Sequence, residues 1–125
     1  MPNPLVDEIR RFLEARDWIH PRPDNLAKSV VIEAAELLEV FQWTHPSLAQ
    51  AKEDPQTLAK VRDELADVLI YAYQLAGLFD LDPDELVRAK LAKNAEKYPA
   101  DQVKAGGNEA YARIKQAHRA AREEK

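Results

Sequence analysis

Two pairs of acidic residues interrupt stretches that are otherwise typical of buried helix. Glu33 and Glu36 lie in "VVIEAAELLEVFQW", and Glu64 and Asp67 lie in "RDELADVLIYAY". With about 100° between successive residues of a helix, Glu33 falls inside the apolar arc and Glu36 at its edge, whereas Glu39 faces the opposite, solvent side. Acidic side chains that converge between two helices cannot all stay ionised alone, because an unpaired buried charge costs several kcal/mol. The two pairs therefore predict a bound cation.

The chemistry of these four carboxylates indicates which ion they would bind. The chain has no cysteine, and neither acidic pair includes a histidine. Ligand sets made only of oxygen favour hard cations, so we predict Mg²⁺, with Mn²⁺ as the alternative, over zinc. Di-iron bundles usually combine Glu with ExxH motifs, which disfavours redox chemistry here. A purely structural role stays open, because acids three residues apart are common in helices and can pair with Lys or Arg.

A basic face is predicted in a later helix. Lys90, Lys93, Asn94 and Lys97 recur at i, i+3, i+4 and i+7, which places their side chains on one side of that helix. Such a face suits a phosphate chain held beside a carboxylate-bound cation. The alternative is a solvated basic face near a helix C-terminus, where Lys complements the helix dipole.

Aromatic and imidazole groups flank the acidic helices. Trp18 and His20 precede the first acidic pair, and Trp43 continues its stripe at the other end. Tyr71 shares a flank with the second pair. Flat rings near phosphates are suited to stacking on a base, although a Trp is otherwise typical of a core or an interface. His20 is a candidate general acid or base, or a hydrogen-bond partner.

The composition is that of one helical globular domain. The chain has 125 residues, 46% of them hydrophobic, only three glycines and a formal net charge of −4. We expect a single domain over residues 1–125, with a core of about 4–99 and a C-terminal extension over 100–125. The mild charge gives no case for binding a nucleic acid polymer. The sequence shows neither a leader pattern nor a long apolar span, so a cytoplasmic protein without membrane contact is expected.

Helical periodicity predicts an all-α fold of long antiparallel helices. The expected helices cover residues 4–17, 25–43, 55–79, 83–97 and 109–124, with loops over 44–55 and 98–108. Asp24 or Asn25 is expected to cap the second helix, and Asp82 the fourth. The last helix is expected to pack weakly or onto a partner subunit. Ile70 and Leu78 lie away from the main apolar stripe of their helix, which predicts at least a homodimer.

Four segments together resemble one family. They are "RDW", "NLAKSVVIEAAELLEVFQW", "RDELADVLIYAY" and "KLAKNAEKYP". Their order and content resemble the MazG-like nucleotide pyrophosphohydrolases, most of all the branch that contains dCTP pyrophosphatases, over residues 12–99. The resemblance implies a bundle-like fold of four long helices with an extra C-terminal helix, assembled as a homodimer or homotetramer. It also implies cleavage of a nucleoside triphosphate to the monophosphate and pyrophosphate.

The resemblance further implies roles for individual residues. The implied Mg²⁺ ligands are Glu33, Glu36, Glu64 and Asp67. The implied base contacts are Trp18, Trp43 and Tyr71, and the implied phosphate contacts are Lys93, Asn94, Lys97 and Tyr98; His20, Asn25 and Lys90 are further candidate substrate ligands beside them. Some related enzymes have a further Glu directly after the first motif acid, where this chain has Ala34.

We therefore predict Mg²⁺-dependent hydrolysis of a deoxynucleoside triphosphate, most of all a pyrimidine such as dCTP, in nucleotide pool cleansing. Glu33, Glu36 and His20 are the candidate catalytic residues, with the attacking water activated by the ion or held by Glu36. Lys93 and Lys97 would steady the leaving pyrophosphate. Two alternatives remain: a non-catalytic helical module that binds a nucleotide or a partner, and a phosphoribosyl-ATP pyrophosphohydrolase.

Overall fold

The computed structural model describes residues 3–19 and 21–123, which form helices joined by short connections. The helices are α1 (Pro4–Glu14), α2 (Pro23–Glu39), α3 (Leu48–Glu53), α4 (Pro55–Leu78), α5 (Pro83–Lys97) and α6 (Ala100–Glu123). No strand occurs among the described residues, which confirms the all-α prediction. The chain divides into two compact units, residues up to 83 and residues from 84 onwards. The assignment of one domain over 1–125 stays a prediction.

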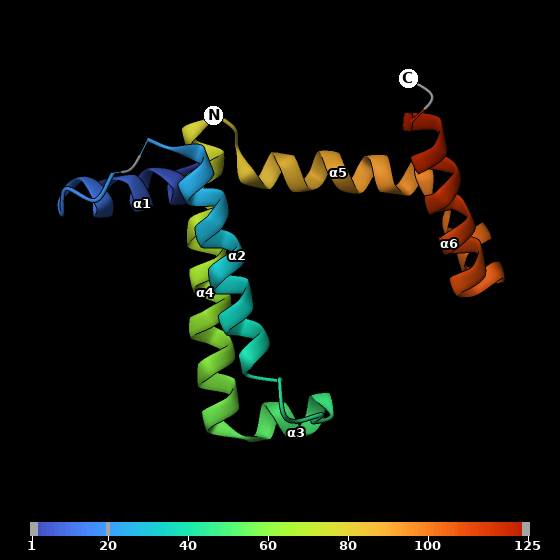
Figure 1. Ribbon diagram of the computed structural model, residues 1–125, viewed down its shortest axis with the longest axis horizontal. Coiled ribbons are helices and arrows are strands. Elements are labelled where there is room, and N and C mark those ends of the chain that lie inside the picture. The colour runs from blue at the N-terminus through green and yellow to red at the C-terminus, as the bar shows by residue number, and fades with distance from the viewer. Residues whose placement is uncertain (1–2, 20, 124–125) are drawn as a thin grey trace. The chain divides into compact units, whose positions relative to one another are not determined.

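The first unit is built on α2 and α4, which lie side by side and run in opposite directions (Figure 1). The short helix α3 lies at the end where the chain turns from α2 into α4. At the other end α1 packs against α4, and Val6, Leu26 and Ala76 are buried there. A β-carbon at Gly77 would lie 2.8 Å from Val6 Cγ1, so α1 approaches α4 at a place where only glycine fits without a shift.

The start of α1 is fixed by a side-chain cap. The Asn3 side-chain oxygen accepts hydrogen bonds from the backbone N–H groups of Leu5, at 3.0 Å, and Val6, at 3.3 Å. Its amide nitrogen donates to Asp82 Oδ1 at 3.0 Å, which ties α1 to the segment after α4. The helix ends at Glu14 rather than at the predicted residue 17, because a turn closes there with the Trp18 N–H donating to the Leu13 carbonyl at 2.9 Å.

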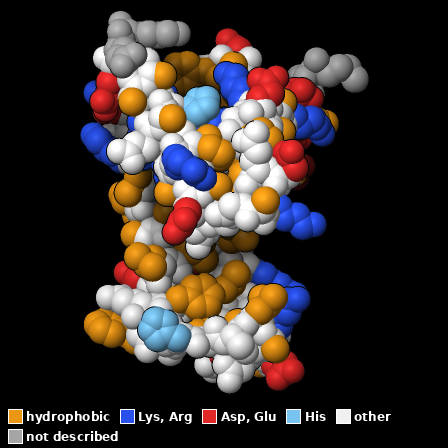
Figure 2. Space-filling view, turned by 90° about the vertical axis from the view of Figure 1, so that its right-hand side faces the viewer, with side chains coloured by type: hydrophobic (Ala, Val, Ile, Leu, Met, Phe, Trp, Pro, Cys, Tyr) orange, Lys and Arg blue, Asp and Glu red, His pale blue; other side chains and the backbone are white. Residues whose placement is uncertain are grey.

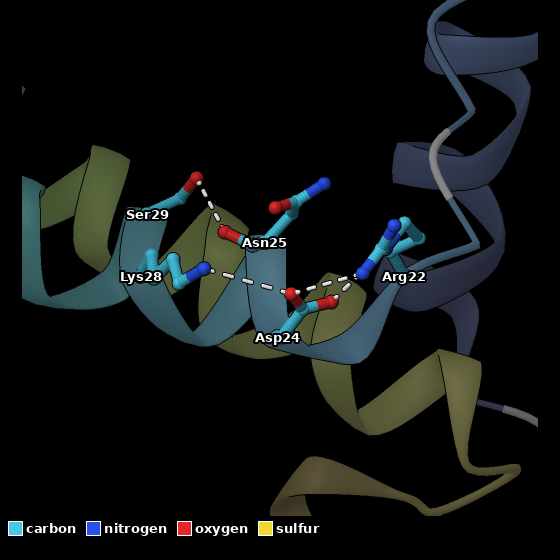
Figure 3. Close-up of polar contacts among 5 residues, drawn as sticks. All are labelled: Arg22, Asp24, Asn25, Lys28 and Ser29. Atoms are coloured by element: carbon cyan, nitrogen blue, oxygen red, sulfur yellow. Dashed lines mark hydrogen bonds and ion pairs between the residues drawn. The ribbon is translucent and has the colours of Figure 1, made fainter.

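The predicted cap of α2 at Asp24 or Asn25 is wrong. The helix begins at Pro23, and Arg22 occupies the cap position without a side-chain hydrogen bond. Proline suits the first helical position because its φ is already helical and its missing N–H would be unpaired there. Asp24 instead forms ion pairs in the first turn with Arg22, at 3.3 Å, and with Lys28, at 3.6 Å (Figure 3).

The end of α2 and the connection to α4 also differ from the prediction. The helix ends at Glu39 instead of residue 43. The N–H groups of Phe41 and Gln42 then donate to carbonyls three residues back, at 3.0 and 3.3 Å, which is the tighter hydrogen-bond pattern of a 3₁₀ turn. Within the predicted loop, Ser47 and Gln50 form a reciprocal capping box that starts α3.

The second unit contains α5 and α6. The start of α5 at Pro83 and its end at Lys97 agree with the prediction. The predicted loop over 98–108 is wrong for most of its length, because helical residues continue from Ala100 and only Gly107, with φ 60° and ψ −148°, breaks the helix. Alanine, glutamine and lysine favour helix there, whereas glycine readily adopts a positive φ. The rings of Tyr98 and Tyr111 stack with centroids 5.0 Å apart.

Large hydrophobic side chains remain exposed on both long helices of the first unit. Val31 and Leu38 of α2 are 68% and 67% exposed, and Leu69 of α4 is 50% exposed. Figure 2 shows hydrophobic side chains at the surface among the charged ones. Across the described residues, no helix combines the length and the apolar character needed to cross a membrane.

Candidate metal centre and nucleotide pocket

Three of the four predicted acidic ligands meet between α2 and α4. Glu33 of α2 and Glu64 and Asp67 of α4 each contribute one carboxylate oxygen, and these oxygens lie within 4.8 Å of one another. The antiparallel pairing of the two helices brings together residues that are more than thirty positions apart in the chain. Glu36 belongs to the same group, because it lies close enough to Glu33 and Glu64 to raise the pKa of both. Glu39, three residues further on, is exposed, as its position on the helix predicts.

The electrostatics of this group show how close the acids are. The pKa of Glu33 is raised from 4.5 to about 7, first by hydrogen bonding with Glu36, then by burial, and then by the negative charges of Glu36, Asp67 and Glu64. The pKa of Glu64 is also raised, chiefly by burial and then by hydrogen bonding with Glu36. The metal-free site therefore holds its charge poorly, because each ionised carboxylate destabilises the next.

The acidic group has no counter-charge within the described part of the chain. None of the ion pairs there involves Glu33, Glu36, Glu64 or Asp67. Glu33 Oε2 and Glu64 Oε2 are buried and accept no hydrogen bond from any described residue. The structural alternative, in which these acids pair with Lys or Arg, is therefore not what the described residues show. Buried oxygens without donors on convergent carboxylates fit a hard divalent cation such as Mg²⁺.

A pocket of about 570 Å³ lies between α1 and α4, directly beside the acidic group. Asp67 belongs to both the acidic group and the pocket wall. The pocket is mostly apolar and is rich in rings. It is lined by Leu5, Glu8, Ile9, Phe12, Leu13, Trp18, Asp67, Leu69, Ile70, Tyr71, Tyr73 and Gln74. Its size and its mixture of apolar walls with a few polar groups are typical of small-molecule sites.

Two of the implied base contacts, Trp18 and Tyr71, both line this wall. Phe12 meets Trp18 edge to face, with ring centroids 6.2 Å apart. The helical spacing of Leu5, Ile9 and Phe12 is typical of the apolar side of an amphipathic helix that packs into a core. They form a pocket wall instead, and neither composition nor spacing distinguishes the two roles.

Other predicted site residues lie outside this pocket wall. Trp43 follows the C-terminal end of α2 and is 85% exposed, while Asn25 is exposed in the first turns of the same helix. His20 lies outside the described residues. The predicted basic face belongs to the second unit, where Lys90 and Lys93 are exposed on α5 and Asn94, Lys97 and Tyr98 are partly buried.

Comparisons with known proteins agree with the resemblance seen in the sequence. A model of the MazG-like family matches residues 28–111. The chain is 39% identical over 107 residues to a Mus musculus protein and 38% identical over 106 residues to a Homo sapiens protein, both named dCTP pyrophosphatase 1. These matches cover 78% and 79% of this chain but only 61% and 62% of the two relatives, so the chain spans less than two thirds of their length.

A solved structure shares both the fold and much of the sequence. The crystal structure of a pyrophosphatase from Archaeoglobus fulgidus matches with a TM-score of 0.67 and 43% identity, over 76% of this chain and 89% of that one. The family model covers both acidic pairs and the basic segment on α5. The chain therefore belongs to the MazG-like family.

Proposed function

We propose that this protein hydrolyses a nucleoside triphosphate to the monophosphate and pyrophosphate, with a pyrimidine deoxynucleotide such as dCTP as the preferred substrate, in nucleotide pool cleansing. One observation carries the proposal: three carboxylates that converge within 4.8 Å border an aromatic pocket of about 570 Å³. A cation site joined to a pocket for a flat ring suits a molecule with phosphates at one end and a base at the other. The names of the curated relatives and of the solved structure support this chemistry.

The proposed cofactor is Mg²⁺, with Mn²⁺ as a possible substitute. Glu33, Glu64 and Asp67 would hold it, with Glu36 as a further ligand or a hydrogen-bond partner of the others. When bound, the ion supplies positive charge that neutralises the phosphates and makes a nearby water more acidic. Binding would also remove the mutual repulsion that raises the pKa of Glu33.

Glu36 is the proposed proton acceptor. Its carboxylate is not among the three that converge within 4.8 Å, yet it is close enough to Glu33 and Glu64 to raise the pKa of both. From there it can orient a water for attack on the α-phosphorus and take the proton that the water loses. A new bond then forms from the water oxygen to the α-phosphorus, and the bond to the bridging oxygen breaks, which releases pyrophosphate. Glu33 is the second catalytic candidate, and His20 remains a candidate acid or base.

The substrate would be held at both ends. Trp18 and Tyr71 offer rings for the base, since both line the pocket. The proposed phosphate ligands are Lys90, Lys93, Asn94 and Lys97 of α5, together with Tyr98, the residue that follows the helix. Asn25 and Trp43 remain proposed substrate ligands that lie outside the pocket wall.

We further propose a homodimer or homotetramer. Val31 and Leu38 are seven residues apart on α2, and Leu65 and Leu69 are four apart on α4, so each pair lies on one side of its helix. All four are exposed in the single chain. A second copy of the two helices would cover them and complete a four-helix bundle. A monomeric mass in light scattering at micromolar concentration would contradict this assembly.

The proposed activity is tested with a substrate panel. Each of the four common deoxynucleoside triphosphates, dUTP, the ribonucleotides and phosphoribosyl-ATP is incubated with the protein and Mg²⁺, and pyrophosphate is measured. We expect release from deoxynucleotides, fastest with dCTP, and none with EDTA. Release from phosphoribosyl-ATP alone would favour the biosynthetic alternative. Release from no substrate would refute the proposal in favour of a binding module.

A further inference from the structure

Gln74 of α4 is a polar side chain in an apolar setting. It lines the pocket between α1 and α4 and also a smaller hollow of about 220 Å³, sharing both with Ile9 and Leu13. The side chain is partly buried, and it forms no hydrogen bond with any other residue that the structure describes. Its amide atoms are not among the buried polar atoms that lack a partner, so a ligand in the pocket can reach them by displacing water.

The position of Gln74 along α4 relates it to the acidic group. Asp67, Tyr71 and Gln74 recur at intervals of four and three residues, which places them along one flank of the helix. The seven residues from Asp67 to Gln74 correspond to about 10 Å along the helix axis. That length is comparable with the reach of a nucleotide from its α-phosphate to the far edge of its base. A substrate with phosphates near Asp67 and its base on Tyr71 would bring that edge toward Gln74.

We propose that Gln74 reads the hydrogen-bonding edge of the base and thereby sets which nucleoside triphosphate the pocket accepts. The proposal rests on the function proposed above and adds a specificity-determining residue to it. A glutamine amide offers an acceptor oxygen and donor N–H groups side by side, which match the amino group and ring nitrogen of cytosine or, with the amide rotated, the carbonyl and ring N–H of thymine. Glu8 lines the same pocket, and its ionised carboxylate can only accept hydrogen bonds. Together the two side chains favour a base with an exocyclic amino group over thymine or uracil.

A polar residue is needed for such a choice because apolar walls discriminate weakly between bases. The rings of Trp18 and Tyr71 can stack on any base. With the base edge held by Gln74, cytosine presents an amino group to the Glu8 carboxylate, whereas thymine and uracil present a carbonyl oxygen. The oxygens that are then left unpaired after water has been displaced separate poor from good substrates.

The test replaces Gln74 with methionine, which has nearly the same length but no amide. We expect kcat/KM for dCTP to fall about tenfold or more, and the preference for dCTP over dTTP and dUTP to approach unity. Gln56→Met is the matched control, since Gln56 is an exposed residue in the first turn of the same helix and does not line the pocket. This control should retain the wild-type preference.

A binding assay separates this proposal from the proposed activity. Isothermal titration calorimetry needs no tryptophan substitution, so the assay leaves the proposed substrate ligands Trp18 and Trp43 in place. Titration with dCMP and dTMP then reports the base preference without turnover, and Gln74→Met should abolish it. Gln74→Glu, which keeps an acceptor but loses the donor, should weaken dCMP binding too and serves if the methionine variant does not fold. Wild-type ratios, within about twofold, in a folded variant would overturn the role of Gln74. Failure of the wild type to cleave any nucleotide would overturn the proposed activity instead.

Discussion

Replacing Gly77 with alanine should destabilise the contact that forms the nucleotide pocket. The new β-carbon would lie 2.8 Å from Val6 Cγ1. Carbon atoms in ordinary contact are about 3.5–4.0 Å apart, so α1 and α4 must separate by about 1 Å. Val6 is buried and has a short, stiff side chain, so the separation cannot be absorbed by a simple rotation.

The expected magnitude follows from two opposing effects. Overpacking a buried contact costs about 1–3 kcal/mol. Replacing glycine by alanine inside a helix stabilises by about 1 kcal/mol. We therefore expect a net loss of about 1 kcal/mol in the free energy of unfolding, measured by urea denaturation followed by circular dichroism. The movement of α1 should also weaken nucleotide binding, because α1 forms one wall of the pocket.

A double-mutant cycle shows whether the contact with Val6 is the cause. Val6→Ala removes the atom that the new β-carbon would meet, so Gly77→Ala should be tolerated in that background. We expect a coupling free energy of about 1 kcal/mol between the two substitutions. Strictly additive effects, or a Gly77→Ala protein as stable as the wild type, would refute this account of how α1 packs on α4.

Three further predictions follow from single contacts. Because the pKa of Glu33 is raised from 4.5 to about 7, the folded protein without a bound cation keeps a proton between these pH values that the unfolded chain has lost. The contribution of Glu33 to the free energy of unfolding is therefore fully present below about pH 4.5 and is lost as the pH rises to about 7. Urea midpoints across this range should fall, and Glu33→Gln should flatten the fall; a flat wild-type profile would count against the clustering of acids. Asn3→Ala should cost about 1 kcal/mol in urea denaturation by removing the cap of α1, and an unchanged midpoint would contradict that role. Trp18→Leu should raise KM about tenfold with a smaller effect on kcat, because stacking contributes about 1–3 kcal/mol per base, whereas a fall in kcat alone would argue against stacking.

The helices and the acidic group could be predicted from the sequence because their causes are local. An aspartate followed by a proline marks the start of both α4 and α5 in the sequence. The structure begins the two helices at the predicted residues, Pro55 and Pro83. The inward positions of Glu33 and Glu64 follow from helical periodicity, which needs no knowledge of the partner helix.

The errors arise where two local signals compete. Asp24 is a good cap residue, but Pro23 before it is better placed to begin the helix, and the side chain of Asp24 pairs with Arg22 instead. The predicted loop over 98–108 contains two adjacent glycines, yet only Gly107 leaves the helical conformation.

The pocket could not be predicted, since periodicity cannot distinguish a wall from a core. Ile9 and Phe12 have the spacing of core residues, but α1 packs against only part of α4 and leaves a hollow between them. Gln74 belongs to none of the motifs in the sequence. Its place in the pocket wall depends on how α1 packs against α4.

Glu36→Gln tests most directly whether the acidic group performs the proposed hydrolysis. Glu39→Gln is the matched control, because Glu39 lies three residues further along α2 and, unlike Glu36, is not among the groups that shift the pKa of Glu33 and Glu64. With Mg²⁺ and dCTP, we predict that pyrophosphate release by the Glu36 variant falls at least about a hundredfold while its helical circular dichroism is retained. The Glu39 variant should match the wild type. Turnover by a folded Glu36→Gln protein close to that of Glu39→Gln would contradict the account.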